Sequence, residues 1–316
     1  MNRFRADLVL LLVALIWGSA FAVQRVAARY FDPYTFNGLR FLLGGLTLFP
    51  FSRLNPWNKA NRLPAGQAPG AANKPRIPVF DRKSNFFMLA AGVVLFAGSS
   101  FQQAGLEYTT AGNAGFITTL YVVLVPVILV IFFKDKIHWV AWLSAGIAIC
   151  GSLLLSTGGT LRLASGDSLE MAGALMWALD VIVVSRAVKH MDIMTFSVGH
   201  YLVAALLNIL VGFGLHMHLE GMAQGWWTIV YIGVLSTAVG YTLQALGQKF
   251  APPPDATILL SMEAVFAALT GFIFLEETMT AIQLAGCGLI LSAVILTQLN
   301  AARRRSVMLK EQSRII

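Results

Sequence analysis

Long runs of apolar residues alternate along the chain with short groups of charged residues, glycine, proline or asparagine. A run of about 20 mainly apolar residues is long enough to cross the ~30 Å hydrocarbon core of a bilayer as a helix. Ten such runs can be traced, near residues 7–27, 35–52, 85–106, 111–133, 138–156, 168–188, 195–215, 226–246, 256–275 and 281–299. The pattern predicts an all-α membrane protein with ten transmembrane helices, and the short connections predict one compact bundle.

The composition supports the membrane prediction. Hydrophobic residues make up 57% of the chain and charged residues only 12%, with a mean hydropathy of +0.71. Soluble domains carry about 25% charged residues, so the composition excludes a soluble protein. The net charge of +8 does not require a nucleic-acid partner, and we expect none, because the basic residues are sorted along the chain.

Lysine and arginine concentrate on every second connection. If the N-terminus is cytoplasmic, the basic groups on its side are Arg3 and Arg5, the loop from Arg53 to Lys83, Lys134 and Lys136, Arg186 and Lys189, Lys249, and Arg303, Arg304, Arg305, Lys310 and Arg314. Only Arg25, Arg29 and Arg162 fall on the other side, with Arg40 just inside the second run. This asymmetry follows the positive-inside rule and predicts an even number of spans with both termini cytoplasmic.

The one long connection, residues 53–85, is rich in proline, asparagine, lysine and arginine. It holds few residues that could build a core, so we expect a flexible cytoplasmic loop. Its positive charge has an alternative use, which is to hold anionic lipid headgroups.

The two halves of the chain repeat one another. The matches are Asp7 with Asp167, Trp17 with Trp177 and residues 32–36 with 192–196 at an offset of 160 residues, then Gln102 with Gln244 and Gly105 with Gly247 at an offset of 142. We therefore divide the chain into a first repeat, 1–156, a second repeat, 157–300, and a basic cytoplasmic tail, 301–316. Five helices per repeat is an odd number, so the second repeat enters the membrane from the opposite side. Inverted repeats of this kind are typical of secondary transporters.

Several segments also resemble a known family. LVALIWGSAFAVQRVA, FNGLRFLLGGLTL, AGNAGFITTLYVVLVPVILVIF and DATILLSMEAVFAALTGFIFLEETMTAIQLAGCGLILSAVIL are similar to the two EamA domains of the drug/metabolite transporter (DMT) superfamily. The resemblance covers nearly all of the chain except the 53–85 loop and the tail. It implies a ten-helix bundle in a bacterial inner membrane that typically exports amino acids or other small metabolites. Ala264, and Lys134 with Asp135, depart from the family pattern, which often has Pro at the first position and Gly-Glu at the other two.

The N-terminal run has a second reading. A basic start, an apolar stretch and the ending Ala20-Phe21-Ala22 are also the pattern of a cleavable signal peptide. The repeat makes this run part of the mature bundle.

Acidic and aromatic residues inside the apolar runs are the candidate site. Glu263 is the one ionisable residue of LLSMEAVFAAL, and a lone acid near mid-membrane costs roughly 2.5 to 3.5 kcal/mol, so it is usually functional or paired. Its repeat mate is Tyr121. Trp17 and Trp177 correspond half-way through their runs, and Asp180 lies one turn from Trp177 on the same face. We predict that these five bind substrate; packing within the bundle is the alternative for the tryptophans.

Amide and basic residues inside the apolar runs form a second group of candidates. Gln102 and Gln244 are predicted to bind substrate, although hydrogen bonds between helices are an equal use of a buried amide. Arg40 and His200 also correspond, but each lies about five residues from a helix end. Their side chains are therefore expected to reach the headgroups.

Glu263 is the first candidate for proton coupling, with Asp180 as its assistant. Burial away from water favours the protonated form of a carboxyl group, so Glu263 could bind a proton or a cationic cargo group in turn. The structural alternative is a hydrogen bond from the protonated acid to a neighbouring helix.

The remaining motifs limit the function. No Gly-Lys dipeptide occurs, so a phosphate-binding loop for nucleotides is absent and we expect no cofactor. His216 and His218 lack a third ligand, so we expect no metal. The sequence predicts a secondary transporter that exports small metabolites such as amino acids, and not an enzyme. The alternatives are a multipass membrane enzyme that uses His216, His218 and Glu220, and a facilitative channel. A stripe of small residues, Ser144, Ala148 and Ser152, suits close helix contact within the bundle or across a homodimer.

Overall fold

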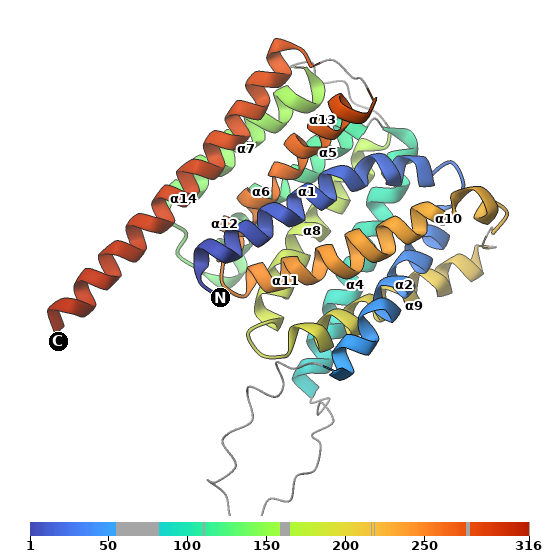
Figure 1. The fold of residues 1–316 in the computed structure, drawn as a ribbon, viewed down its shortest axis with the longest axis horizontal. Coiled ribbons are helices and arrows are strands. Elements are labelled where there is room, and N and C mark those ends of the chain that lie inside the picture. The colour runs from blue at the N-terminus through green and yellow to red at the C-terminus, as the bar shows by residue number, and fades with distance from the viewer. Residues whose placement is uncertain are drawn as a thin grey trace, which may run out of the picture.

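The computed structural model describes residues 1–54, 82–109, 111–158, 165–215, 217, 219–275 and 279–315. Within these ranges the chain is helical and contains no strand (Figure 1). The helices are α1 (Arg3–Ala27), α2 (Pro33–Leu54), α4 (Arg82–Tyr108), α5 (Ala111–Thr119), α6 (Tyr121–Phe133), α7 (Trp139–Thr157), α8 (Asp167–Ala187), α9 (Ile193–Gly214), α10 (Met222–Val230), the π-helix η1 (Tyr231–Tyr241), α11 (Thr242–Gln248), α12 (Pro253–Leu260), α13 (Met262–Leu275) and α14 (Ala281–Ile315). Most of the predicted 53–85 loop lies outside the described residues.

Among the described residues, eight helices are long and apolar enough to cross a membrane. They are α1, α4, α5 with α6 as Ala114–Phe133, α7, α8, α9, the rod Met222–Gln248 formed by α10, η1 and α11, and α14 as far as Arg304. This confirms the prediction of an all-α membrane protein. The other two predicted runs are helical as well, but α2 carries Asn37 and Arg40, and the ninth run is divided into the short helices α12 and α13.

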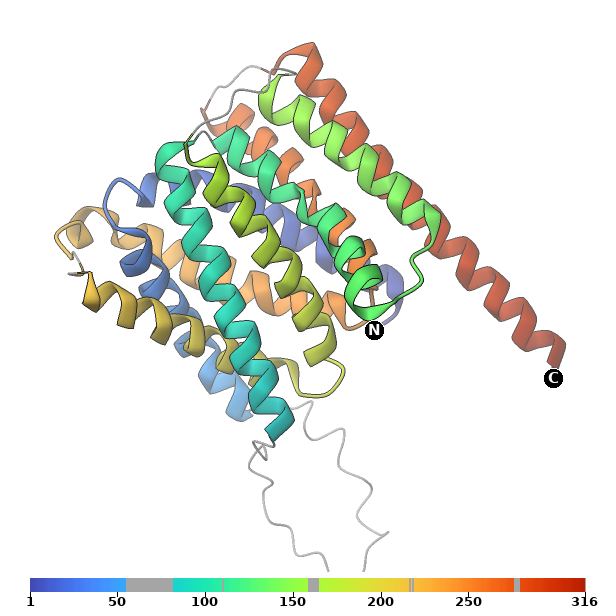
Figure 2. The same cartoon turned by 180° about the vertical axis from the view of Figure 1, so that it is seen from behind.

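The helices pack as one bundle around α1 and α8. α7 lies along α14, α2 lies along α9, α4 packs on both α8 and α9, and α1 packs on α13 (Figures 1 and 2). Large apolar side chains such as Phe132, Phe213 and Ile131 are exposed on the outside, as expected for a surface that faces lipid. α14 runs on past the bundle to Ile315, so the predicted tail continues the last helix.

Two corresponding spans are interrupted in the middle of the bundle. α5 ends before Leu120, whose N–H donates to the Ile117 carbonyl over 3.0 Å, and α6 begins at Tyr121. α12 ends before Ser261, whose N–H donates to the Thr257 carbonyl over 3.0 Å, and α13 begins at Met262. Breaks of this kind place backbone polar groups next to buried space, which a membrane protein tolerates only inside the bundle.

Small residues allow the closest helix contacts. A Cβ atom added to Gly18 of α1 would lie 2.6 Å from the Glu263 carbonyl oxygen of α13, and one added to Gly151 of α7 would lie 2.8 Å from the Gly286 carbonyl oxygen of α14. The predicted stripe of Ser144, Ala148 and Ser152 is fully buried. It therefore serves packing within this chain.

Ion pairs and hydrogen bonds connect the helix ends. Arg3 reaches Asp7 over 2.7 Å and Asp255 over 3.0 Å, which joins the start of α1 to the start of α12. Asp167, the repeat mate of Asp7, accepts a hydrogen bond of 2.6 Å from the Thr109 hydroxyl at the end of α4. The two repeats thus use their matching acids in similar places.

Candidate functional site

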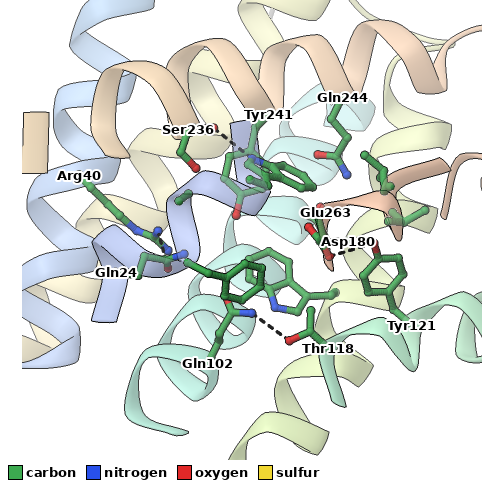
Figure 3. A pocket seen from close by; sticks show the side chains of 16 residues that line it. Gln24, Arg40, Gln102, Thr118, Tyr121, Asp180, Ser236, Tyr241, Gln244 and Glu263 are labelled. Carbon is green, nitrogen blue, oxygen red and sulfur yellow. Dashed lines mark hydrogen bonds between the residues drawn. The ribbon is translucent and has the colours of Figure 1, made fainter. Parts of the chain in front are cut away.

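A cavity lies where the two interrupted spans meet α1 and α8 (Figure 3). Its lining consists of Trp17, Ala20, Phe21, Gln24, Arg40, Gln102, Thr118, Tyr121, Trp177, Asp180, Val181, Ser236, Tyr241, Gln244, Leu260 and Glu263. The volume open to the centres of water-sized molecules in this cavity is about 50 Å³. By the same measure, a cavity needs roughly 10–15 Å³ to hold one water. The seven residues predicted from the sequence to bind substrate all line this one cavity.

Glu263 and Tyr121 meet at one side of the cavity, each beside one of the two helix breaks. Tyr121 is the first residue of α6 and Glu263 the second residue of α13, and both are at most 5% exposed. The Tyr121 hydroxyl donates to Glu263 Oε1 over 3.2 Å (Figure 3). Within the described residues this phenol is the one hydrogen-bond partner of the acid, so the acid lies in the setting expected for a group that changes its proton or ligand.

Three aromatic rings form one wall. The Tyr241 ring lies 4.8 Å from the Trp17 ring at 56° and 6.2 Å from the Trp177 ring at 24°, measured between ring centroids. The Trp17 indole N–H donates to the Ser236 carbonyl oxygen of η1 over 3.3 Å. The Trp177 indole N–H has no partner among the residues that the structure describes. One tryptophan is therefore fixed by the backbone of η1, whereas the other keeps a free donor beside the cavity.

Asp180 is paired with a histidine. Its Oδ1 lies 3.4 Å from His200 Nε2, and both side chains are at most 2% exposed. The orientation of the two groups does not meet hydrogen-bond geometry, so the contact is a close approach that becomes an ion pair when His200 is protonated. The expectation that His200 lies at the membrane surface is wrong, because α2 and α4 pack along α9 and the His200 side chain is 2% exposed.

Arg40 is also inside the bundle. Its side chain is 2% exposed, its Nη1 donates to Gln24 Oε1 over 3.1 Å, and its guanidinium lies over the Phe41 ring at 4.6 Å and the Phe36 ring at 5.3 Å. The expected snorkelling to the headgroups is therefore wrong. The interlocked packing of α2 with α9 and η1 holds the side chain at cavity depth.

The two predicted amides differ in their bonding. Gln102 Nε2 donates to the Thr118 hydroxyl over 3.1 Å, so it joins α4 to α5. Gln244 is 2% exposed, and its Oε1 has no partner. Gln244 is thus the amide that is free to accept a hydrogen bond from a cargo.

The sequence analysis missed several lining residues. Ala20, Phe21 and Gln24 follow Trp17 at the helical spacings of three, four and seven residues. They share a helix face with Trp17, and this spacing is the signal that identifies them from the sequence. Ser236 and Tyr241 gave no such signal, because they are five residues apart on the π-helix η1. π-helical turns are frequent at functional sites.

The histidines considered for a metal site, His216 and His218, lie outside the described residues. Within the described residues, His, Cys, Asp and Glu do not gather in a group of three that could hold a metal ion.

Comparisons with known proteins agree on one family. The model of the EamA-like transporter family matches residues 4–157 and 164–299. An uncharacterized transporter of Archaeoglobus fulgidus is 31% identical over 302 residues, which are 94% of this chain and 87% of the relative. The threonine/homoserine exporter RhtA of Escherichia coli (strain K12) is 32% identical over 133 residues, which are 41% of this chain and 43% of the relative. A protein chain known from its crystal structure superposes with a TM-score of 0.73 at 17% identity, covering 96% of this chain and 99% of that chain.

Proposed function

Because the chain belongs to the EamA-like transporter family, we propose that it is a secondary transporter that exports small metabolites such as amino acids by alternating access. The observation that carries this proposal is the cavity in the middle of the bundle, lined by two acids, an arginine and five aromatic side chains. A substrate site near the midplane, between repeats and beside interrupted helices, is the usual design of secondary transporters.

The arrangement of helices supports two inverted repeats of five spans each. The interruptions at Leu120 and Ser261 fall in corresponding spans. The pairs α2 with α9 and α7 with α14 each join a helix to its counterpart. Elements that pack on their own counterparts are those expected to lie on the pseudo-symmetry axis between the halves.

Amino-acid cargo is supported by charge and by one relative. Arg40 and Glu263 offer groups of opposite sign in one cavity, which suits a zwitterion. The relative RhtA is named a threonine/homoserine exporter, and it aligns with 41% of this chain.

A transport screen in proteoliposomes tests the function. The purified chain should exchange a labelled amino acid across the bilayer, and unlabelled cargo on the far side should accelerate this exchange. A facilitative channel shows no such acceleration, and a membrane enzyme changes the cargo without moving it. Absence of exchange for amino acids, organic cations and nucleobases would reject the proposed function.

The two tryptophans provide a prediction for substrate binding. Trp17→Ala and Trp177→Ala are each expected to reduce exchange about 2- to 30-fold, because each removes a flat ring that can stack on cargo or attract a cation at about 0.5–2 kcal/mol. The thermal unfolding temperature of each purified variant should change proportionally less than its exchange rate. Exposed Trp226→Ala is the matched control. Full exchange per folded molecule in the Trp17 and Trp177 variants would assign both rings to packing.

The topology gives a second prediction. With both termini and the 53–85 loop in the cytoplasm, reporter fusions at residue 316 and within residues 106–110 should report opposite sides of the membrane. The reason is that an odd number of spans separates these two sites in the ten-span arrangement. Activity of both reporters on the same side contradicts it.

A further inference from the structure

Corresponding positions in the two repeats carry different charges around the cavity. At the offset of 160 residues, Arg40 corresponds to His200, and Ala20 corresponds to Asp180. In the second repeat the basic side chain has an acid beside it, since His200 Nε2 lies 3.4 Å from Asp180 Oδ1. In the first repeat the position of the acid is held by a methyl group.

Arg40 accordingly lacks a carboxylate partner. The ion pairs formed among the described residues do not include Arg40. Its one hydrogen bond to a side chain is the 3.1 Å bond to the neutral Gln24, and its Nε has no partner. A buried guanidinium has five N–H donors, and leaving such a charge unpaired is costly. The site is therefore incomplete without an anionic group.

The Arg40 side chain is part of the cavity wall. Arg40, Gln24 and Ala20 all contribute to its lining. Figure 3 shows Arg40 and Gln24 together at one side, with Glu263 and Tyr121 at the other. The rings of Phe36 and Phe41 hold the guanidinium by cation–π contact without using its donors.

We propose that Arg40, positioned by Gln24 beside Ala20, binds the carboxylate of the cargo in the place where the second repeat has the carboxylate of Asp180. This inference rests on the proposed function, because it concerns the same cavity. The planar guanidinium can donate two parallel N–H bonds to a carboxylate. An α-amino acid bound in this way directs its ammonium group away from Arg40, toward the side of Glu263.

The first experiment compares amino acids with their amides. Binding of L-threonine and L-threoninamide to the full chain in nanodiscs is measured by titration calorimetry. Arg40→Gln is expected to weaken threonine binding about 10- to 100-fold, which is the loss of a charge-assisted hydrogen bond, and to leave threoninamide binding nearly unchanged. Arg25→Gln is the matched control, because Arg25 is exposed and follows Gln24 on α1.

A second pair of variants keeps Arg40 in place. Ala20→Asp gives Arg40 an internal acid, as Asp180 does for His200, and is expected to weaken threonine binding at least about tenfold by occupying the same donors. Ala20→Asn adds the same bulk without charge, so it should keep the preference for threonine over threoninamide. The difference between these two variants isolates the charge even if Arg40→Gln does not fold.

The outcomes separate this inference from the proposed function. Wild-type protein that binds threonine and threoninamide equally, or Ala20→Asp that keeps the wild-type preference, overturns the role of Arg40. If the wild-type protein exchanges only cargo without a carboxylate, the proposed transport function stands and the proposed role of Arg40 is rejected. Absence of exchange across the whole panel rejects the transporter itself.

Discussion

Glu263→Gln is expected to abolish accumulation of cargo driven by a pH gradient, while exchange at equal concentrations continues. The glutamine keeps an oxygen that can accept the 3.2 Å hydrogen bond from Tyr121, but it cannot bind and release a proton. One proton moved across one pH unit provides about 1.36 kcal/mol, which corresponds to a tenfold concentration ratio. The variant should therefore lower an accumulation ratio of about ten to about one.

The measurement uses proteoliposomes with an imposed pH gradient and a labelled amino acid. Asp135→Asn is the matched control, because Asp135 is an exposed acid at the end of α6 and should accumulate cargo as the wild type does. If Glu263→Gln accumulates cargo to the wild-type ratio with the same pH dependence, Glu263 is a structural residue that only bonds to Tyr121.

Gly18→Val is expected to prevent the folded bundle from forming in good yield. The Cβ atom would lie 2.6 Å from the Glu263 carbonyl oxygen, 2.8 Å from the Ala267 nitrogen and 2.8 Å from the Phe266 Cβ. Backbone atoms of a packed helix cannot turn aside as a flexible side chain can, so α13 must move away from α1. Overpacking costs about 1–3 kcal/mol where the core adjusts, and displacement of α13 should raise this cost.

The yield of monodisperse protein and its thermal unfolding in detergent measure this effect. Gly288→Val is the control, because a Cβ atom at Gly288 of α14 meets nothing within 4 Å. If both variants yield equally stable protein, the contact of α1 with α13 is looser than these distances describe.

The apolar runs predicted where the helical spans lie, but not where a span is interrupted. A run of apolar residues reports that a segment prefers lipid, but it does not report its hydrogen bonding. The sequence 256–275 therefore reads as one helix, while the structure interrupts it at Ser261. Next to this break Gly18 lets α1 approach the Glu263 backbone closely, and the hydropathy of the sequence does not report such a contact.

The candidate site was partly accessible to sequence reasoning for a similar reason. Trp17, Trp177 and Glu263 stand out because a polar or large aromatic group in the middle of an apolar run needs a partner or a cavity. Arg40 and His200 were placed wrongly because their depth was counted from helix ends. The depth of a side chain depends on how neighbouring helices cover it, and α9 and η1 cover Arg40.

The π-helix η1 determines which of its side chains meet the cavity. In an α-helix each residue turns the direction of its side chain by about 100°, as follows from 3.6 residues per turn, so residues five apart point about 140° away from each other. Ser236 and Tyr241 are five apart, yet both line the cavity, because hydrogen bonding from i to i+5 brings them to one face. The direction in which each side chain of this segment points is thus set by its winding, and rewinding it as an α-helix from Tyr231 onward would rotate the Tyr241 ring out of the aromatic wall.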